Sequence, residues 1–396
     1  MKKNIVIVED DFIIQELHRH YVENLGHNVV ACFERGSDVI DFFKDNTADL
    51  IMMDIRLEDS LDGIETMKRI QEIRSIPVVY ISGNTEDSNY KRALNTNMKG
   101  FLSKPLAPDE LEKVIDSINV LTDSILYAER IQKAIFPQRQ EIHKNFANSL
   151  YICRPKDIIS GDFSFMVPRK RHGDIVGGIG DCTGHGIPAA LLSVLSHEII
   201  TSNIRKNKDL KTVINRLNNS IIRNLSRLGK DDGISDGLDL IMFRIVPSES
   251  KIEISGIKRP FIHYSAKEKT MQYYSLKGAS IGAPIHSLDD IPFYTLPYGE
   301  DDYFYFFSDG ITDQFGGPQS RKLMKKGLLE CLENLSTMPP LKREIELDIF
   351  LRKWQGSLEQ TDDMIFMGIS PSQVNVRYSN PANEEHVTNI EVTTPH

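Results

Sequence analysis

The chain has 396 residues, of which 40% are hydrophobic and 26% charged, as is typical of globular protein, and this length predicts two or three domains. The formal net charge of -9, with no long run of Lys or Arg, argues against a nucleic-acid partner, because phosphate backbones need a basic surface. The four cysteines form no CxxC pair, which argues against a zinc site or a disulfide framework. Neither a signal peptide nor an apolar run of membrane-spanning length is evident, so we expect a reduced, cytoplasmic protein that does not bind membranes.

The first part of the chain, residues 4–120, alternates short apolar runs with amphipathic helical stretches such as Ile13 to Leu25 and Ile64 to Ile73. Repeats of this β-α kind predict an α/β domain with a doubly wound, five-stranded parallel sheet. Functional sites in such sheets lie at the carboxyl ends of the strands. The predicted strands are Ile5–Val8, Val29–Cys32, Leu50–Met53, Val78–Ile81 and Gly100–Leu102.

A different apolar period begins at Val114, where seven positions are separated alternately by four and three residues and six of them are apolar. Packing of the last helix of the first domain accounts for this pattern to about Val120 but not beyond it. We therefore expect a helical linker that ends before Pro137 and pairs with a second copy, with Gln132 able to fix the register. The alternative is a single helix buried along one face. The seven positions are Val114, Ile118, Leu121, Ile125, Ala128, Gln132 and Ile135.

Residues 140–371 combine predicted strands and long predicted helices without regular crossovers, which indicates an α+β domain with a mainly antiparallel core. The tail at residues 372–396 is polar, and we expect it to be disordered. The predicted domains are thus residues 1–120, a helical linker at 121–139, and residues 140–371. The predicted strands of the last domain are Ile175–Ile179, Leu240–Ile245, Tyr303–Phe307 and Met364–Ile369, and the helices are Ala189–Asn203 and Leu210–Leu228.

Polar and charged side chains follow the predicted strands of the first domain. Glu9 and Asp10 come after the first strand, and Asp54 comes after the third. Like charges at converging strand ends need a counter-cation, and oxygen ligands suit Mg²⁺. Ser82 and Lys104 follow the next two strands, where a hydroxyl and an ammonium suit a phosphoryl group carried by Asp54.

In this order and spacing these residues resemble the receiver domains of two-component systems, over about residues 3–120. The resemblance implies that a histidine kinase transfers a phosphoryl group to Asp54 and that Phe101 is the aromatic switch residue. The alternative is a receiver fold that no longer takes phosphate, although every acid of the pocket is present. The match also includes Asp62-Gly63, Ser82-Gly83 and Lys104-Pro105, the last with an expected cis peptide bond.

Four acidic motifs with small neighbouring residues mark the second domain. Glycines beside an acid let the backbone approach a metal closely, and aspartates without His or Cys partners point to Mg²⁺ or Mn²⁺. Two such ions can hold a hydroxide and a phosphate for in-line hydrolysis. A turn or helix cap is the alternative for each acid alone. The motifs are Ser160-Gly161-Asp162-Phe163, Gly180-Asp181-Cys182-Thr183-Gly184-His185-Gly186, Ser308-Asp309-Gly310 and Thr361-Asp362-Asp363-Met364.

Together with the segments Ser124–Gln132 and Arg154–Asp162, these motifs resemble the stage II sporulation protein E-type phosphatases of the PPM family, over about residues 120–370. The resemblance implies a β-sandwich core flanked by helices, and Mn²⁺- or Mg²⁺-dependent removal of phosphate from Ser or Thr. It implies that Asp181 bridges two ions and that the usual substrate is an anti-sigma-factor antagonist. The implied ligands are Asp162, Asp181, Asp309, Asp362 and the backbone carbonyl of Cys182.

Two departures from the family pattern are Ser160, in place of a usual glycine, and Ile365, in place of a usual threonine. His185 is as well explained by local hydrogen bonds as by catalysis, and a turn explains Asp236-Gly237 and Asp239. The predicted function is a response regulator with phosphatase output. The alternative is a non-catalytic module that uses the same fold to dock a partner.

Overall fold

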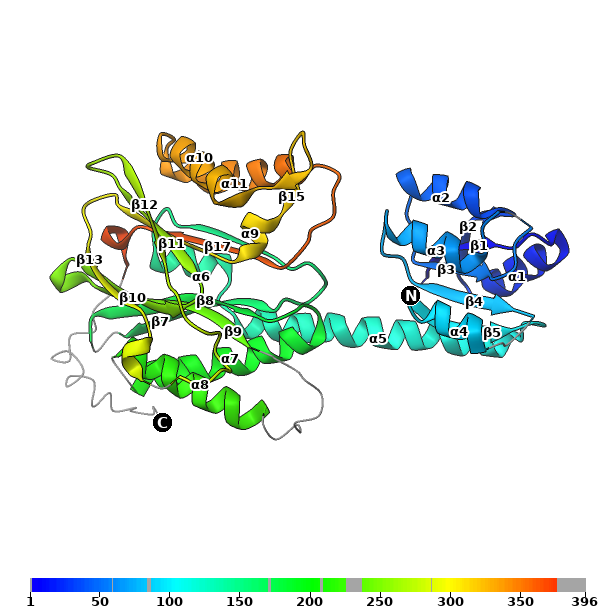
Figure 1. Cartoon of the computed structure of the whole chain (residues 1–396), viewed down its shortest axis with the longest axis horizontal. Coiled ribbons are helices and arrows are strands. Elements are labelled where there is room, and N and C mark those ends of the chain that lie inside the picture. The colour runs from blue at the N-terminus through cyan, green and yellow to red at the C-terminus, as the bar shows by residue number, and fades with distance from the viewer. Residues whose placement is uncertain are drawn as a thin grey trace, which may run out of the picture. The chain divides into compact units, whose positions relative to one another are not determined.

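The computed structural model describes residues 2–58, 60–83, 87–169, 172–206, 209–225, 237–285 and 287–375. The chain divides into two compact units, Met1–Ser124 and Ile125–His396 (Figure 1).

The first unit is a parallel sheet in the order β2-β1-β3-β4-β5, with helices on both faces. Its central strands are apolar on both sides and fully buried, as a sheet covered on both faces requires. The predicted doubly wound fold is confirmed. The strands are β1 (Asn4–Val8), β2 (Asn28–Phe33), β3 (Leu50–Asp54), β4 (Val78–Ser82) and β5 (Met98–Ser103), and the helices before α5 are α1 (Phe12–Asn24), α2 (Gly36–Asp45), α3 (Gly63–Gln71) and α4 (Asp87–Ala93).

Helix starts in this unit are set by acidic caps. Asp11 accepts hydrogen bonds from the backbone N–H groups of Ile13 and Ile14 at the start of α1. Asp62 does the same for Glu65 at the start of α3. Such caps satisfy N–H groups that have no partner within the helix. They fix where α1 and α3 begin, directly after the loops that carry the acids of the site.

Helix α5 (Pro108–Ile135) contains the boundary between the two units. Pro108 and the acids Asp109 and Glu110 occupy its first turn, where a proline and negative charges favour a helix start. Leu111, Ile115 and Ile118 pack in the core of the first unit. The predicted helix up to Ile135 is therefore present, and its first seam positions belong to the face that covers the sheet of the first unit.

The second unit is a sandwich of two five-stranded antiparallel sheets, ordered β13-β10-β9-β8-β7 and β12-β11-β14-β17-β6. Apolar residues of both sheets, among them Phe243 and Phe306, whose rings stack at 5.0 Å, fill the space between them. The predicted antiparallel core and sandwich are confirmed. The strands are β6 (Leu150–Arg154), β7 (Asp162–Arg169), β8 (Asp174–Cys182), β9 (Leu238–Val246), β10 (Lys251–Ile257), β11 (Pro260–Ser265), β12 (Thr270–Ser275), β13 (Phe293–Pro297), β14 (Tyr303–Phe307) and β17 (Met364–Ile369).

Helix pairs cover the outer faces of both sheets. Helices α7 (Ile187–Lys206) and α8 (Leu210–Leu225) pack on the first sheet, and α10 (Met324–Ser336) and α11 (Pro340–Gln355) pack on the second (Figure 1). The last three residues of the predicted helix Leu210–Leu228 lie outside the described residues. Shorter elements are α6 (Arg139–Asn145), α9 (Asp309–Asp313), β15 (Phe315–Gly316), β16 (Arg321–Lys322) and the 3-10 turns Pro247–Glu249, Leu288–Asp290 and Pro371–Gln373.

Among the described residues, α7 alone is long and apolar enough, by length and composition, to pass for a membrane span, with a mean hydropathy of 1.2. The sequence analysis did not single it out. Half of this stretch is buried, and α7 packs against β7, β8 and α8. These are the contacts of a core helix in a folded domain.

The start of the predicted disordered tail is attached to the second unit. Val374 forms a β-bridge with Phe146 and packs against the sandwich core, and the backbone N–H of Asn375 donates to the carbonyl of Asn145. Residues 372–375 are therefore part of the domain, contrary to the expected boundary. Residues 376–396 lie outside the described residues.

Candidate functional site

The acids of the first unit converge at the carboxyl ends of β1 and β3. Glu9, Asp10 and Asp54 each offer an oxygen, and these oxygens all lie within 4.8 Å of one another. Lys104, directly after β5, places Nζ 2.5 Å from Asp54 Oδ2 and 2.8 Å from Glu9 Oε1. The strand ends thus bring together three carboxylates and one ammonium, as the β-α repeats predict.

The electrostatics of this pocket suit a small cation. Burial raises the pKa of Glu9 to about 7, with a further contribution from the nearby Asp54, although Lys104 opposes the shift. Glu9 Oε2 is buried and makes no hydrogen bond to the described residues, at 3.9 Å from His18 Nδ1. A buried oxygen without a partner and an all-oxygen donor set fit Mg²⁺.

The remaining predicted receiver residues line the same edge of the sheet. Ser82 ends β4, is buried, and accepts a hydrogen bond on its carbonyl from the backbone N–H of Lys104. The peptide bond between Lys104 and Pro105 is cis, as expected. Phe101 on β5 is half-buried, with its ring centroid 5.7 Å from that of Tyr90. The strand ends therefore bring Lys104 to Asp54 and place Ser82 at the end of the neighbouring strand β4.

In the second unit, three aspartates lie side by side across neighbouring strands. Asp162 on β7 pairs in register with Asp181 on β8, and Asp181 pairs with Asp239 on β9. Asp309 begins α9 directly after β14, and Asp362 immediately precedes β17. Strands from both sheets thus deliver acids to one end of the sandwich. The interpretation of Asp239 as a turn residue is wrong, because it is a strand residue beside Asp181; Asp236 lies outside the described residues.

These acids are held in a setting that disfavours negative charge. Burial, followed by the charge of Asp181, raises the pKa of Asp162 well above its usual range. Burial raises the pKa of Asp181 to about 7, with contributions from Asp309, Asp362 and Asp239 that Arg259 partly offsets. Asp162 Oδ2 is buried without a hydrogen-bond partner among the described residues. Close carboxylates of this kind call for cations, and the oxygen donors fit Mg²⁺ or Mn²⁺.

Small residues and one further acid set the backbone of this site. A Cβ on Gly161 would lie 2.8 Å from Cβ of Ala189 on α7, and one on Gly310 would lie 1.9 Å from the Asp363 carbonyl, so both positions need glycine. The carboxylate of Asp363 accepts hydrogen bonds from the backbone N–H groups of Lys156 and Gly161, each at 2.7 Å. Asp363 therefore positions the loop that leads into Asp162, and Ile365 behind it is simply buried in the sandwich core.

Two motif residues have local roles. His185 Nδ1 lies 3.1 Å from Asp157 Oδ2, and both side chains are half exposed, so a local contact accounts for this histidine. The side chain of Cys182 is 1% exposed and packs in the core next to α7. Gly184 and Gly186 take φ values of 82° and 77°, which explains the glycines of this loop.

Arg259, which the sequence analysis missed, is the main basic residue of the site. It is 6% exposed, and Nη2 lies 2.5 Å from Asp181 Oδ2 and 3.3 Å from Asp239 Oδ2. Nη1 lies 3.1 Å from Asp309 Oδ2. A single arginine between β10 and β11 carries no signal of its own in the sequence. Only the fold brings it to the acids.

Gln132 connects α5 to the same site. It is 7% exposed; its Nε2 donates to the Ser160 carbonyl at 2.8 Å, and its Oε1 accepts from the Ser160 backbone N–H at 3.1 Å. Ser160 Oγ in turn accepts from the backbone N–H of Asp162. The expectation that Gln132 sets the register of a helix pair is therefore wrong, because its amide is fully engaged inside the second unit.

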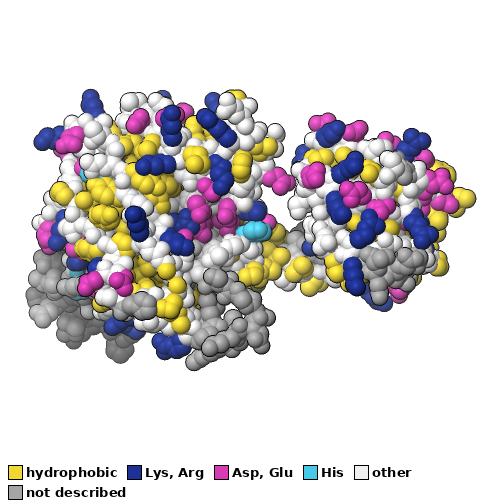
Figure 2. Space-filling model, viewed as in Figure 1, with side chains coloured by type: hydrophobic (Ala, Val, Ile, Leu, Met, Phe, Trp, Pro, Cys, Tyr) yellow, Lys and Arg dark blue, Asp and Glu magenta, His cyan; other side chains and the backbone are white. Residues whose placement is uncertain are grey.

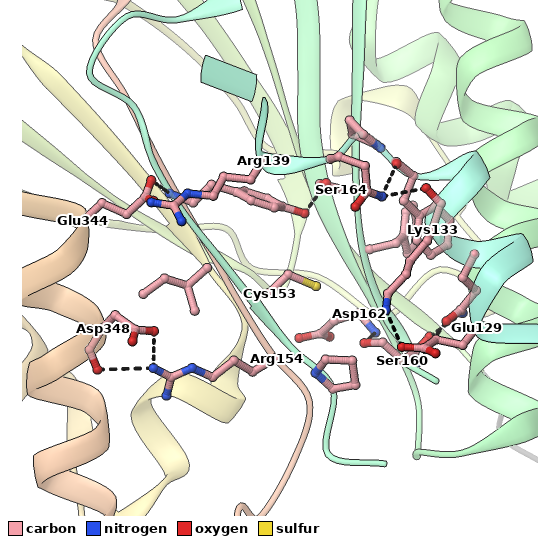
Figure 3. Close-up of a pocket in the computed structure, with 18 of the residues that line it drawn as sticks. Glu129, Lys133, Arg139, Cys153, Arg154, Ser160, Asp162, Ser164, Glu344 and Asp348 are labelled. Atoms are coloured by element: carbon pink, nitrogen blue, oxygen red, sulfur yellow. Dashed lines mark hydrogen bonds and ion pairs between the residues drawn. The ribbon is translucent and has the colours of Figure 1, made fainter. Parts of the chain in front are cut away.

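A cavity of about 470 Å³ reaches Asp162 from the side of α5 and α11. Figure 3 shows Asp162 and Cys153 on its wall, with Lys133 and Glu129 of α5 on one side. Ion pairs between Arg139 and Glu344 and between Arg154 and Asp348 lie on the other side. This cavity separates the end of α5 from α11 within the second unit.

Known families match both units. Residues 5–116 match the response regulator receiver domain family, and residues 171–371, just over half of the chain, match the stage II sporulation protein E family. The chain belongs to the stage II sporulation protein E family. Its first unit is a receiver domain and its second a PPM-type serine/threonine phosphatase domain. Asp181, Asp309 and Asp362 fall inside the second match, and Asp162 lies just before it.

Similar solved structures and curated relatives cover parts of the chain. The SiaA-PP2C domain of Pseudomonas aeruginosa aligns with 64% of this chain and 98% of its own length, with a TM-score of 0.57 and 21% identity, which shows the fold alone. The transcriptional regulatory protein CrdR of Helicobacter pylori is 29% identical over 28% of this chain and 53% of its own length. The uncharacterized transcriptional regulatory protein YcbL of Bacillus subtilis is 33% identical over 27% of this chain and 46% of its own length. The chain spans about half the length of these two relatives.

Proposed function

We propose that this chain is a two-component response regulator in which phosphorylation of Asp54 controls a metal-dependent protein phosphatase. The observation that carries the proposal is the convergence of Asp162, Asp181 and Asp309 at one end of the sandwich, in a chain that also has a complete acidic receiver pocket. A surface that only docks a partner has no need for buried carboxylates that repel one another.

The proposed metal ligands are the acids that the fold brings together. Glu9, Asp10 and Asp54 would hold Mg²⁺ in the receiver domain, where Ser82 and Lys104 bind the phosphoryl group and Phe101 responds to it. In the phosphatase domain two Mn²⁺ or Mg²⁺ ions would be held, with Asp181 between them, by Asp162, Asp181, Asp309, Asp362 and the carbonyl of Cys182. The buried, unpartnered oxygens of Glu9 and Asp162 support both assignments.

The proposed reaction is hydrolysis of a phosphoserine or phosphothreonine ester. Bound ions supply an activated water and offset the charge of the phosphate. The chain's residues hold the geometry: Asp363 fixes the backbone at Gly161, and Gly310 lets α9 approach β17 so that Asp309 faces the other acids. No side chain is needed as a nucleophile, because bound ions would supply the activated water.

We infer the partners from the family and from charge. The phosphodonor is a histidine kinase, and the substrate is a phosphorylated protein of the anti-sigma-factor-antagonist class in a partner-switching pathway. The net charge of -9 supports a protein substrate in the cytoplasm over nucleic acid. We assign the receiver to residues 1–120, a linker to 121–139 and the phosphatase to 140–375, since Val374 and Asn375 pair with Phe146 and Asn145.

We propose that α5 carries the signal between the domains and pairs with a second copy of the chain. Gln132 supports the first part, because it binds Ser160 two residues before Asp162. A shift of α5 would therefore move a metal ligand. Exposed apolar residues on α5 support the second part, namely Val120, Leu121, Tyr127 and Ile131.

The test is phosphate release from a phosphoserine-bearing antagonist protein by the full chain, with Mn²⁺ and then with excess chelator. We expect release with Mn²⁺ and none with chelator, and restoration on adding Mn²⁺ back. Tight binding of the phosphoprotein without any release would instead establish the docking module.

A further inference from the structure

Arg259 is buried among the acids that the proposed function assigns to metal ions. Its guanidinium contacts Asp181, Asp239 and Asp309, and two of these three are proposed ligands. Burial alone would lower the pKa of the Arg259 guanidinium. The surrounding carboxylates outweigh this effect and raise that pKa above its usual value. An arginine always keeps its proton, so it occupies this position as a fixed cation.

Not every N–H donor of the Arg259 guanidinium has a hydrogen-bond partner among the described residues. It has five N–H donors in a planar fork, and Arg259 Nε is buried without a hydrogen-bond partner among the described residues. When cations bind Asp181 and Asp309, the two carboxylates nearest to Arg259 are taken, and the positive charges repel each other at a few ångströms. Arg259 then keeps only Asp239 as a counter-charge, and a buried arginine that loses two of its three carboxylates favours a further anion.

Arg259 faces a pocket in which an anion can bind. It lines a pocket of about 320 Å³ together with Lys258, Lys325, Tyr273, Asp309 and Thr312. Lys325 Nζ lies 3.6 Å from the centroid of the Tyr273 ring, and Lys258 Nζ donates to Ser280 Oγ at 2.8 Å. Figure 2 shows basic side chains beside a group of acidic ones on the face of this unit that it presents. Arg259, Lys258 and Lys325 bring three cations to this pocket, which Asp239, Asp309 and Asp313 also line. Metal ions on the acids would leave the cations available to a phosphate, and guanidinium forks bind phosphate through paired hydrogen bonds.

We propose that Arg259 is the phosphate-binding residue of the phosphatase site, and that without metal its guanidinium occupies the carboxylates in place of the ions. Metal binding releases it from Asp181 and Asp309, and the freed guanidinium then binds the non-bridging oxygens of the substrate phosphate. Phosphate affinity is thereby tied to metal loading. The inference deepens the proposed function and rests on it.

The test compares wild-type full-length protein with Arg259→Gln and Arg259→Lys by titration calorimetry. Mn²⁺ is titrated into metal-free protein, and inorganic phosphate is titrated into the Mn²⁺-loaded protein. Arg259→Gln removes the competing charge, so we expect Mn²⁺ to bind about tenfold tighter and phosphate about tenfold weaker than in wild type. Arg259→Lys keeps the charge but not the fork. We expect it to bind Mn²⁺ nearly as wild type does and phosphate more weakly.

The matched control is Arg244→Gln. Arg244 is a partly buried arginine on β9 that pairs with Asp174 and Glu253, away from the acids of the site, and Asp174 keeps its partner Arg169. We expect its Mn²⁺ and phosphate affinities to equal those of wild type. The circular dichroism spectrum and melting temperature of each variant establish that it is folded.

The outcomes separate this inference from the function beneath it. Mn²⁺ binding by wild type with unchanged Mn²⁺ and phosphate affinities in Arg259→Gln overturns the inference alone. Weaker Mn²⁺ binding in Arg259→Gln shows that the arginine supports the ligands and also overturns it. Wild-type protein that binds no Mn²⁺ overturns the proposed function, and the inference with it. If Arg259→Gln does not fold, Arg259→Lys decides, and wild-type phosphate affinity in that variant contradicts the proposal.

Discussion

Asp181 occupies the middle of the row formed by Asp162, Asp181 and Asp239 on neighbouring strands. It is the only one of the three with a proposed ligand role toward both ions. We predict that Asp181→Asn lowers Mn²⁺-dependent turnover by orders of magnitude, because it removes the charge shared between the ions. Turnover and Mn²⁺ affinity are measured on the same preparation.

The matched control for this substitution is Asp302→Asn. Asp302 is also buried but precedes β14 at the strand end opposite Asp309, where it binds His263 and the backbone N–H groups of Ala266 and Gly299. The substitution Asp302→Asn should lower the melting temperature while leaving the turnover of the folded protein unchanged. Near-normal turnover by Asp181→Asn would rule out the two-ion mechanism.

Asp54 is the acid that Lys104 contacts most closely in the receiver pocket. We predict that acetyl phosphate modifies wild type in a Mg²⁺-dependent step but does not modify Asp54→Ala. Asp49→Ala is the control, because Asp49 lies before β3 and accepts a hydrogen bond from the backbone N–H of Asn4. Mass spectrometry reports the added phosphoryl group. The same base-labile label in Asp54→Ala would show that another residue is the acceptor.

At the residue scale, sequence motifs predicted the acids and missed their basic partner. Each of the four acids lies beside a glycine or a second acid at one end of an apolar run, namely Asp162, Asp181, Asp309 and Asp362. Such a local pattern can be recognised in the sequence without knowledge of the fold. Arg259 has no such surroundings, since its contacts reach 78 residues back to Asp181 and 20 back to Asp239. Only the pairing of β8, β9 and β10 brings these residues to one place.

At the element scale, the proposed pairing of α5 with a second copy can be tested by placing charged residues on the helix. The side chain of Leu121 is 49% exposed and that of Ile125 is partly exposed, so both are available to a second copy. We predict that Leu121→Glu with Ile125→Glu reduces dimerisation and uncouples phosphatase activity from Asp54 phosphorylation. Each apolar side chain that pairing covers is worth roughly 1.5–3 kcal/mol.

Sedimentation and phosphatase assays on this double variant decide the question. Lys113→Glu is the control, because it changes an exposed residue of α5 that forms an ion pair with Asp109 and lies outside the seam. An unchanged dimer with an unchanged response to phosphorylation would mean that the apolar residues of α5 serve only to pack each end of the helix within its own domain.

Helix α7 contains a buried histidine, and we predict that it makes the second domain less stable in acid. Burial, followed by the charge of Arg205, lowers the pKa of His197 from 6.5 to about 4, and its ring packs on Phe136 and Phe163. Above pH 6.5 the imidazole is neutral in both the folded and the unfolded chain. Between pH 6.5 and 4 only the unfolded chain binds the proton, so stability falls as the pH falls through that window.

The free energy of unfolding should therefore drop by about 2 kcal/mol between pH 7 and pH 5 on account of this residue. His197→Phe keeps the aromatic packing and should reduce the pH dependence by that amount. Fluorescence of Trp354, the only tryptophan in the sequence, follows unfolding of this domain in denaturant. The same pH dependence in both proteins would show that His197 is not the group responsible.

Periodicity predicted all five strands of the receiver, but only four of the ten strands of the sandwich and neither α10 nor α11. The central strands β1, β3 and β4 of the receiver are buried on both faces, so their apolar runs are easily recognised in the sequence. The heptad of α5 was harder to interpret, because Ile118 packs on the receiver sheet and Gln132 packs beneath Ser160. One period thus served two different packing surfaces, which a sequence pattern alone does not separate.

At the scale of the whole molecule, we propose that α5 connects the acceptor Asp54 of one domain to the metal site of the other. The order of the domains and their families were evident from motifs alone, because each motif set is complete in its own part of the chain. The proposed coupling through α5 was not evident from the sequence, because the hydrogen bonds between Gln132 and Ser160 join residues 28 apart that belong to no common motif.

The most direct test of this coupling is the rate of phosphate release from a phosphoserine-bearing antagonist protein, measured in Mn²⁺ with and without beryllofluoride. We predict that beryllofluoride changes the rate of wild-type protein several-fold, that Asp54→Ala does not respond, and that chelator abolishes release in both. The same rate in wild type with and without beryllofluoride, or an equal response in Asp54→Ala, would contradict control of the phosphatase by the receiver.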